Sequence, residues 1–209
     1  MKHIIFDFDG TLADSTAVFA SVWNTIAQKY DFKKVQLEDI DSLKKLSIAE
    51  RSKLFNFPLH KLPIILPQFY RLYQQSLTDV HLFDGMKDLV NEIAQKGYTV
   101  AIISSNATDN IVAFLKTNGI DCVSEVLCSS HIFGKDKVIK KYLKEANIHK
   151  SDVLYVGDEH RDIVACKKVG IPIIWVAWGY DAIEVVQSEE PDHTVFSPAE
   201  ILTIIEHNS

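Results

Sequence analysis

The stretch "GMKDLVNEIAQKGYTVAIISS" (residues 85–105) indicates the fold class of the chain. Its first half has the apolar spacing of a helix that ends at Gly97, and its second half is a continuous apolar run rich in β-branched residues. A strand without a polar face is typical of a parallel sheet that helices cover on both sides. The stretch therefore predicts one helix–strand unit of a layered α/β domain.

The same alternation of helix and strand continues on both sides of this stretch. Apolar runs alternate with helical segments, and glycines stand at several of the helix ends. The predicted helices are 108–119, 135–147 and 160–170, and the predicted strands are 3–9, 98–105, 124–130, 152–158 and 171–179. We therefore predict an α/β domain with a parallel sheet and helices on both of its faces.

Residues 15–80 differ from the rest of the chain in glycine content and in the spacing of apolar residues. No glycine occurs between Gly10 and Gly85, and apolar residues recur at three- and four-residue steps over residues 19–30. This spacing predicts an amphipathic helix. A second, more polar helical region follows at 38–56. We expect this part of the chain to be all-helical.

Three prolines lie in the last part of this helical segment. We expect Pro58, Pro63 and Pro67 to break the chain before a helix resumes at 68–77. The segment lies between the first predicted strand and all the others, so it is an insertion into one α/β domain. The predicted division is a core of residues 1–14 and 81–209 with an all-helical cap of residues 15–80.

The overall composition is that of an acidic globular protein. The 209 residues carry 22 Lys and Arg against 28 Asp and Glu, a formal charge of −6, which argues against a nucleic-acid partner. No segment has the uninterrupted apolar length of a membrane span or of a secretory signal. The three cysteines lack C-x-x-C spacing, so we expect reduced thiols in a cytoplasmic protein without a membrane partner.

Polar residues gather at the positions where the predicted strands end. The carboxyl ends of parallel strands meet at one edge of the sheet, where α/β proteins form their sites. Acids follow the first and the fourth strand along the chain, two serines end the second, and a lysine opens the helix at 135–147. The candidate site residues are Asp7, Asp9, Ser104, Ser105, Lys135, Asp158 and Asp162.

Three carboxylates brought to one place repel each other unless a cation lies among them. Asp7, Asp9 and Asp158 offer hard oxygen ligands, which suit Mg²⁺ with room for water. The metal, Lys135 and Ser104 together make a cradle for a dianionic phosphate. One carboxylate can attack phosphorus, and a second one two residues on can protonate the leaving alkoxide and then activate water. Side chains two residues apart in an extended segment point the same way, so Asp7 and Asp9 can share a target.

Two lysines are candidates for the cation of this site. Lys135 and Lys137 both lie in "GKDK" (134–137). Lys135 directly follows the Gly134 turn and precedes Asp136, a residue type favoured where a helix begins, so we favour Lys135 and keep Lys137 as the alternative.

Four stretches of the chain together resemble a known family. They are "IIFDFDGTLADS" (4–15), "AIISSN" (101–106), "FGKDKVIKKYLKE" (133–145) and "YVGDEHRDIVACKKVGIP" (155–172). The chain resembles the haloacid dehalogenase-like hydrolase superfamily, in its phosphatase branch with a helical cap, and in particular its phosphoglycolate-phosphatase-type members. The resemblance implies a Rossmann-like core, Mg²⁺ as cofactor and a small phosphorylated metabolite as partner. The dehalogenases that name the superfamily lack an acid at the position of Asp9, so dehalogenation is not expected.

The resemblance also implies roles for the acids of the first motif. Asp7 matches the nucleophile, and Asp9 matches the general acid/base. The implied metal ligands are the carboxylates of Asp7 and Asp158 and the backbone carbonyl of Asp9.

The remaining motif residues match groups that hold the phosphate or support the metal. Ser104 and the backbone amide of Ser105 match the phosphate-binding groups, and Lys135 matches the lysine that stabilises the transferred phosphoryl group. Asp162 matches the second acid of the last motif, which usually orients the metal shell. Glu159 departs from the small polar residue that often follows the aspartate, and its role is open.

The leading hypothesis is a magnesium-dependent phosphatase that hydrolyses a small-molecule phosphate monoester through an aspartyl-phosphate on Asp7. A phosphomutase on the same scaffold is the alternative, because a cap that keeps water from the aspartyl-phosphate would let a sugar accept the phosphoryl group. A non-catalytic binding protein is the third, and loss of one or more candidate residues would be its expected mark. The sequence defines neither the substrate, nor the cap residues that select it, nor the oligomeric state.

Overall fold

A six-stranded parallel sheet forms the centre of the protein. The computed structural model describes residues 2–129 and 131–207. The strand order is β5-β4-β1-β6-β7-β8, and every pair in this sheet is parallel. The strands are β1 (His3–Phe6), β4 (Thr99–Ser104), β5 (Val123–Cys128), β6 (Val153–Gly157), β7 (Ile173–Val176) and β8 (His193–Val195). The predicted parallel α/β sheet is confirmed, and β8 adds an edge strand that the sequence analysis did not predict.

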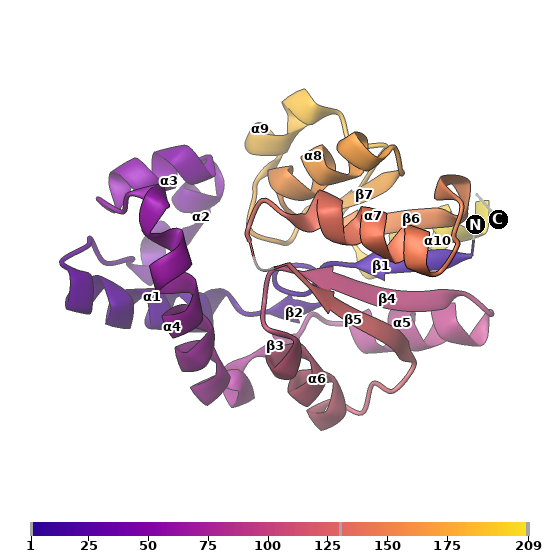
Figure 1. Ribbon diagram of the computed structural model, residues 1–209, viewed down its shortest axis with the longest axis horizontal. Helices are drawn as coiled ribbons and strands as arrows, with labels where there is room; N and C mark the ends of the chain where they lie inside the picture. Colours follow the sequence, from indigo (N-terminus) through magenta and orange to yellow (C-terminus); the bar gives the residue numbers. More distant parts are fainter. Residues whose placement is uncertain (1, 130, 208–209) are drawn as a thin grey trace.

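Both faces of the sheet are buried under helices. On β1, Ile4 and Phe6 belong to the core on one side of the sheet, whereas Ile5 belongs to the core on the other side. Figure 1 shows α7 and α8 on one side of the sheet and α5 and α6 on the other. The helices are α5 (Met86–Gln95), α6 (Thr108–Thr117), α7 (Lys135–Glu145), α8 (His160–Val169), α9 (Ile183–Val186) and α10 (Pro198–His207).

The register of the central strands brings distant parts of the chain to one edge. Phe6, the last residue of β1, pairs with Ile102 of β4 and with Val156 of β6. Because the three strands run in parallel, the chain leaves all of them at the same edge of the sheet. The candidate residues that follow these positions within two residues are Asp7, Ser104 and Asp158.

Four helices lie beyond the carboxyl ends of the strands (Figure 1). They are α1 (Thr16–Tyr30), α2 (Ile40–Lys44), α3 (Ile48–Leu54) and α4 (Leu62–Gln75). The two short strands β2 (Ala13–Asp14) and β3 (His81–Leu82) pair in antiparallel fashion where the chain enters and leaves this group. The helical character predicted for the cap is therefore present, and the domain boundaries stay a prediction. Single 3₁₀ turns lie at Leu37–Asp39, Leu59–Lys61, Leu77–Asp79, Lys150–Asp152 and Gln187–Glu189.

The predicted proline break before residue 68 is wrong for two of the three prolines. Helix α4 begins at Leu62 and continues through Pro67. Pro63 occupies the first turn, where the missing N–H has no helical partner in any case. Pro67 is exposed, while Ile65 and Phe69 of the same helix are buried in the core. Packing of that apolar face therefore outweighs the hydrogen bond that Pro67 removes.

Within the described part of the chain, no helix is both long enough and apolar enough to cross a membrane.

Candidate active site

Asp7 and Lys135 form a buried ion pair at the carboxyl edge of the sheet. Asp7 follows β1 and Lys135 opens α7, and each is 2% exposed. Lys135 Nζ donates to Asp7 Oδ2 over 2.5 Å, and the backbone N–H of Phe8 donates to Asp7 Oδ1 over 2.7 Å. Phe8 itself is fully buried in the core. The strand end, the turn and the helix start thus hold the Asp7 carboxylate in place.

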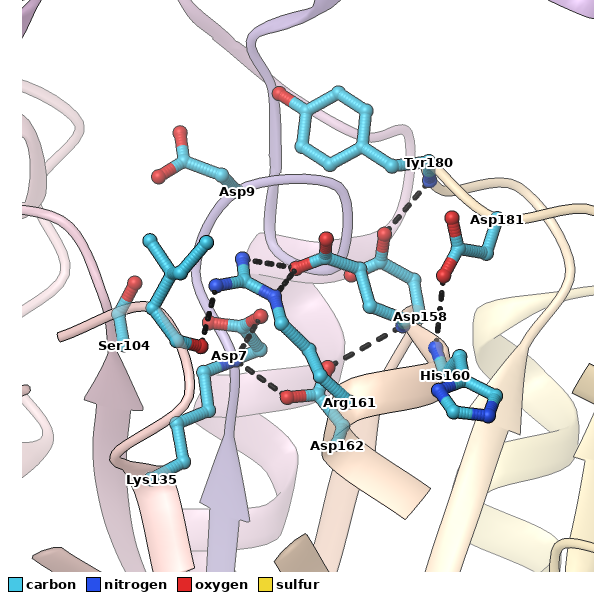
Figure 2. A network of polar contacts seen from close by, with 12 residues as sticks. Asp7, Asp9, Ser104, Lys135, Asp158, His160, Arg161, Asp162, Tyr180 and Asp181 are labelled. Atoms are coloured by element: carbon cyan, nitrogen blue, oxygen red, sulfur yellow. Dashed lines mark hydrogen bonds and ion pairs between the residues drawn. The ribbon is translucent and has the colours of Figure 1, made fainter. Parts of the chain in front are cut away.

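Two further acids complete a cluster of carboxylates around Asp7. Asp158 directly follows β6, and Asp162 lies in the first turn of α8. Lys135 Nζ also donates to Asp162 Oδ1 over 2.5 Å, so one ammonium bridges two acids (Figure 2). Asp7, Asp158 and Asp162 each offer an oxygen within 4.8 Å of the others, and all three residues are buried.

This cluster is short of positive charge. Burial raises the pKa of Asp162 to about 7, although Lys135 opposes the shift. Burial, followed by the repulsion of neighbouring acids, raises the pKa of Asp158 well above its usual range. Burial disfavours the charged form of Lys135, but Asp162 and Asp7 outweigh that effect and raise the pKa of the lysine. A buried set of oxygen donors with this charge balance fits a hard divalent cation.

Asp158 is held by backbone and hydroxyl donors on two loops. Thr11 Oγ1 donates to its Oδ1 and the backbone N–H of Tyr180 donates to its Oδ2, each over 2.7 Å. The loop after β7 approaches so closely that a Cβ at Gly179 would lie 2.1 Å from Asp158 Cβ. Glycine is therefore required at position 179 by the fit around this carboxylate.

Asp9 has a separate set of partners. Its Oδ1 accepts from Ser15 Oγ (2.6 Å) and Tyr73 OH (2.7 Å), and its Oδ2 accepts from Asn106 Nδ2 (2.7 Å). Burial raises the pKa of Asp9 to about 6, although the three hydrogen bonds oppose the shift. Figure 2 shows the Asp9 carboxylate apart from the cluster around Asp7. The two acids thus have different partners and different electrostatic environments.

A cavity of about 320 Å³ lies over these acids. Asp7, Asp9, Ser104 and Ser105 contribute to its wall, together with residues of α1 to α4. Ser104 and Ser105 are both buried, and Ser104 Oγ accepts a hydrogen bond from the backbone N–H of Asn106 over 3.1 Å. The predicted nucleophile, acid/base and phosphate-binding serines are therefore brought to one cavity beneath the four helices.

The structure also places the three residues whose roles were open. Lys135 lies in the site, whereas Lys137 is exposed on α7. Glu159 is 6% exposed and pairs with the guanidinium of Arg161, whose Nε donates to Glu159 Oε2 over 2.7 Å. A further N–H of Arg161 donates to the carbonyl of Ile132 over 2.9 Å. The negative charge that Glu159 adds is thus balanced by the guanidinium of Arg161, two residues later at the start of α8.

Several contact residues were missed by the sequence analysis. Asn106 directly follows the two candidate serines and lies in the quoted stretch 101–106, but the sequence analysis gave it no role. Tyr73 and Ser15 contact Asp9 from α4 and from the residue before α1, and no local pattern distinguishes them from other cap residues. Thr11 and Tyr180 contact Asp158 only because two distant loops meet.

One arginine joins the four helices to the rest of the protein. Arg51 of α3 pairs with Asp181 over 2.6 Å and donates to the carbonyl of Tyr180 over 3.1 Å. Asp181 in turn accepts from the backbone N–H of His160 over 2.8 Å, at the start of α8. These contacts link α3 to the loop after β7 and to the helix that carries Asp162.

Comparison with known proteins gives consistent results over nearly the whole chain. Phosphoglycolate phosphatase of Synechococcus elongatus is 29% identical over 209 residues, covering 98% of this chain and 97% of that protein. Pyrophosphatase PpaX of Bacillus mycoides is 22% identical over 210 residues, covering 98% and 97%. A solved structure described as a predicted phosphatase from Clostridium acetobutylicum has a TM-score of 0.84 at 20% identity, covering 99% and 98%. At that identity the structural likeness shows the fold alone.

A family model described as "Haloacid dehalogenase-like hydrolase" matches residues 4–176. The match is most of the chain, and it includes the acids after β1 and β6, the serines that end β4 and the lysine that opens α7. The carboxyl-edge site, the parallel sheet and the family model agree, and the chain therefore belongs to the haloacid dehalogenase-like hydrolase family.

Proposed function

We propose that the protein is a magnesium-dependent phosphatase that hydrolyses a small phosphate monoester through an aspartyl-phosphate on Asp7. The observation that carries this proposal is the arrangement of Asp7, Lys135 and Asp9. Asp7 and Asp9 line one cavity, Lys135 contacts Asp7, and burial raises the pKa of Asp9 to about 6. Relatives named as a phosphoglycolate phosphatase and a pyrophosphatase support a phosphatase.

The carboxylate cluster supports the choice of Mg²⁺. Asp7 and Asp158 would hold the ion through carboxylate oxygens, and Asp162, expected from the sequence only to support the metal shell, offers a third oxygen within 4.8 Å of theirs. The backbone carbonyl of Asp9 stays a predicted ligand. When bound, the ion would supply positive charge that offsets the repulsion between the phosphate dianion and the acids.

In the first step, a carboxylate oxygen of Asp7 attacks phosphorus, and the bond between phosphorus and the ester oxygen breaks. The protonated carboxyl group of Asp9 gives its proton to the departing oxygen, which leaves as an alcohol. The pKa of about 6 that burial gives Asp9 keeps a share of this acid protonated near neutral pH. The ammonium of Lys135, 2.5 Å from Asp7, offsets charge on the transferred phosphoryl group.

In the second step, a water molecule attacks the phosphorus of the aspartyl-phosphate. The carboxylate of Asp9 takes a proton from that water, and the bond between phosphorus and the Asp7 oxygen breaks. Inorganic phosphate leaves, Asp7 is again a carboxylate, and Asp9 is again protonated. Ser104 Oγ and the backbone N–H of Ser105 are proposed to hold the phosphate oxygens through both steps.

The four helices are proposed to act as a cap over these steps. Residues 15–80 would exclude bulk water from the cavity and contact the leaving group. The partners of Asp9 support this division of roles, because Tyr73 belongs to the helical segment and Asn106 to the core. The cytoplasmic location stays a prediction.

Release of inorganic phosphate tests the proposal directly. The wild-type protein is expected to hydrolyse an aryl phosphate with Mg²⁺ and to lose that activity in EDTA. Asp7→Asn is expected to lower kcat by about 10⁴-fold or more, because the nucleophile is removed. Retained activity in Asp7→Asn, with deamidation excluded by mass spectrometry, would contradict the nucleophile assignment. An isomerised sugar phosphate in place of free phosphate would instead identify a phosphomutase.

A further inference from the structure

Away from the acids, most of the residues in the wall of the cavity are apolar. Helices α1 and α4 and the segment after α3 contribute aromatic and aliphatic side chains to this wall. The apolar lining residues are Phe19, Trp23, Phe55, Phe57, Ile65 and Phe69. Phe57, Ile65 and Phe69 are also part of the buried core, so packing holds this part of the wall in place. A volume of about 320 Å³ is within the range of cavities that bind organic ligands.

The cations in this wall are mostly neutralised by the protein itself. Arg161 is paired with Glu159 and also donates to the carbonyl of Ile132. Arg51 is paired with Asp181. Lys44, the third cation among the described lining residues, is partly exposed, so solvent screens its charge.

We propose that the substrate is a phosphate monoester whose leaving group is apolar and uncharged, such as an alkyl or aryl alcohol. This inference rests on the proposed phosphatase function and specifies its substrate class. The phosphate would lie at Asp7 and Ser104, and the apolar group would extend between α1 and α4.

The physical reason is the difference in desolvation between the two kinds of leaving group. An apolar group gains free energy when it leaves water for an apolar wall. A second anion would lose its hydration there, and both arginines of the wall already have a carboxylate partner. A phosphate ester with a carboxylate on its short alcohol is therefore expected to be a poorer substrate than the uncharged ester of similar size.

A series of n-alkyl phosphates from ethyl to hexyl tests the proposal with Mg²⁺ present. Each methylene that enters the cavity is expected to raise kcat/KM about fourfold. The higher kcat/KM is expected to come from a lower KM with kcat unchanged, because the leaving group contacts the wall equally in the ground state and the transition state. Ethyl phosphate and phosphoglycolate form a matched pair that differs by the carboxylate, and ethyl phosphate is expected to be the better substrate.

A pair of leucine variants connects the series to the cavity. Leu43 lines the cavity from α2, whereas Leu37 is 60% exposed and outside it. Leu43→Lys is expected to lower kcat/KM for hexyl phosphate about tenfold or more and to lower kcat/KM for ethyl phosphate by a smaller factor. Leu37→Lys adds the same charge and is expected to leave both esters unchanged.

The outcomes separate this inference from the function on which it rests. Higher kcat/KM for phosphoglycolate than for ethyl phosphate, or no dependence on chain length, would overturn the inference and leave the phosphatase proposal standing. Equal loss of hexyl phosphate hydrolysis in Leu43→Lys and Leu37→Lys would also overturn it. Failure of the wild-type protein to hydrolyse any of these esters would overturn both.

Discussion

Among single residues, Lys135 carries the charge balance of the site. Its ammonium contacts Asp7 and Asp162 at 2.5 Å, and it is 2% exposed. Removing a buried partner leaves uncompensated charge behind, which costs far more than an exposed ion pair is worth. The stability of the sheet edge and the proposed chemistry therefore depend on the same side chain.

Lys135→Met is expected to lower the free energy of unfolding by about 3 kcal/mol at pH 8 in EDTA, because two buried acids lose their shared cation. It is also expected to lower kcat about 10²-fold or more with Mg²⁺. Urea unfolding and phosphate release measure the two effects. Lys137→Met removes an exposed lysine of the same helix and should change stability by less than about 0.5 kcal/mol. Equal effects of the two substitutions would contradict the assignment of Lys135.

Burial of Asp9 lowers the free energy of unfolding of the protein by an amount that depends on pH. We call this loss of stability the penalty. Burial raises the pKa of this carboxyl group from 3.8 to about 6, so the folded state binds a proton more tightly than the unfolded chain. The penalty is absent below pH 4, grows as pH rises from 4 to 6, and reaches about 3 kcal/mol by pH 7. Relative to wild type, the free energy of unfolding of Asp9→Asn is therefore expected to rise by about 3 kcal/mol between pH 4 and pH 7. Urea unfolding across this range, in EDTA, measures it, and a difference that stays constant with pH would contradict the shift.

At the scale of elements, helix α4 combines a buried apolar face with an exposed proline. Ile65, Phe69 and Tyr73 are buried, and Tyr73 also donates to Asp9. Pro67 lies inside the same helix on its exposed side, where it removes one hydrogen bond. Tertiary packing rather than intrinsic helix propensity therefore keeps this element helical.

Pro67→Ala is expected to raise the free energy of unfolding by about 2 kcal/mol, because alanine restores the helical hydrogen bond at some cost in unfolded-chain entropy. Pro63→Ala serves as the control, since the first turn has no hydrogen bond to restore. It should change stability by less than about 0.5 kcal/mol. Chemical denaturation of the three proteins checks both values, and a destabilised Pro67→Ala would mean that the proline is needed where it lies.

At the scale of the whole molecule, metal binding should be coupled to folding. Two acids of the cluster directly follow β1 and β6 and the third lies in α8, so their oxygens lie together only in the folded chain. A ligand that binds only the folded state stabilises it by mass action.

Mg²⁺ at one hundred times its Kd is expected to raise the free energy of unfolding by about 2.7 kcal/mol, and Tm by about 5–10 °C. Asp158→Asn should abolish most of this increment, because it removes a ligand charge. Asp181→Asn removes a buried acid outside the cluster and should keep the increment. Thermal unfolding with and without Mg²⁺ measures it, and an equal increment in wild type and Asp158→Asn would contradict the metal site.

The elements and site residues that could be predicted from the sequence are those with a strong local residue pattern. The central strands were predicted because a continuous apolar run is a local signal, and β8 was missed because it has three residues at the edge of the sheet. Pro67 was misread because the packing that keeps α4 helical through it is not contained in any local pattern, whereas Pro63 occupies the first turn, where proline is tolerated. Lys135 could be favoured over Lys137 from its place at a helix start, and the structure places it accordingly.

The sequence by itself determined that this chain forms a parallel α/β sheet and that acids, serines and a lysine follow its strand ends. Both follow from local hydrophobic patterns and from the rule that parallel strands end at one edge. Tertiary structure alone decided which groups meet there. Asp9 accepts a hydrogen bond from Tyr73, 64 residues away, and Asp158 accepts one from Thr11, 147 residues away. The apolar cavity over Asp7 likewise exists only once α1 to α4 pack beside the sheet, because its wall comes from distant segments that no local pattern brings together.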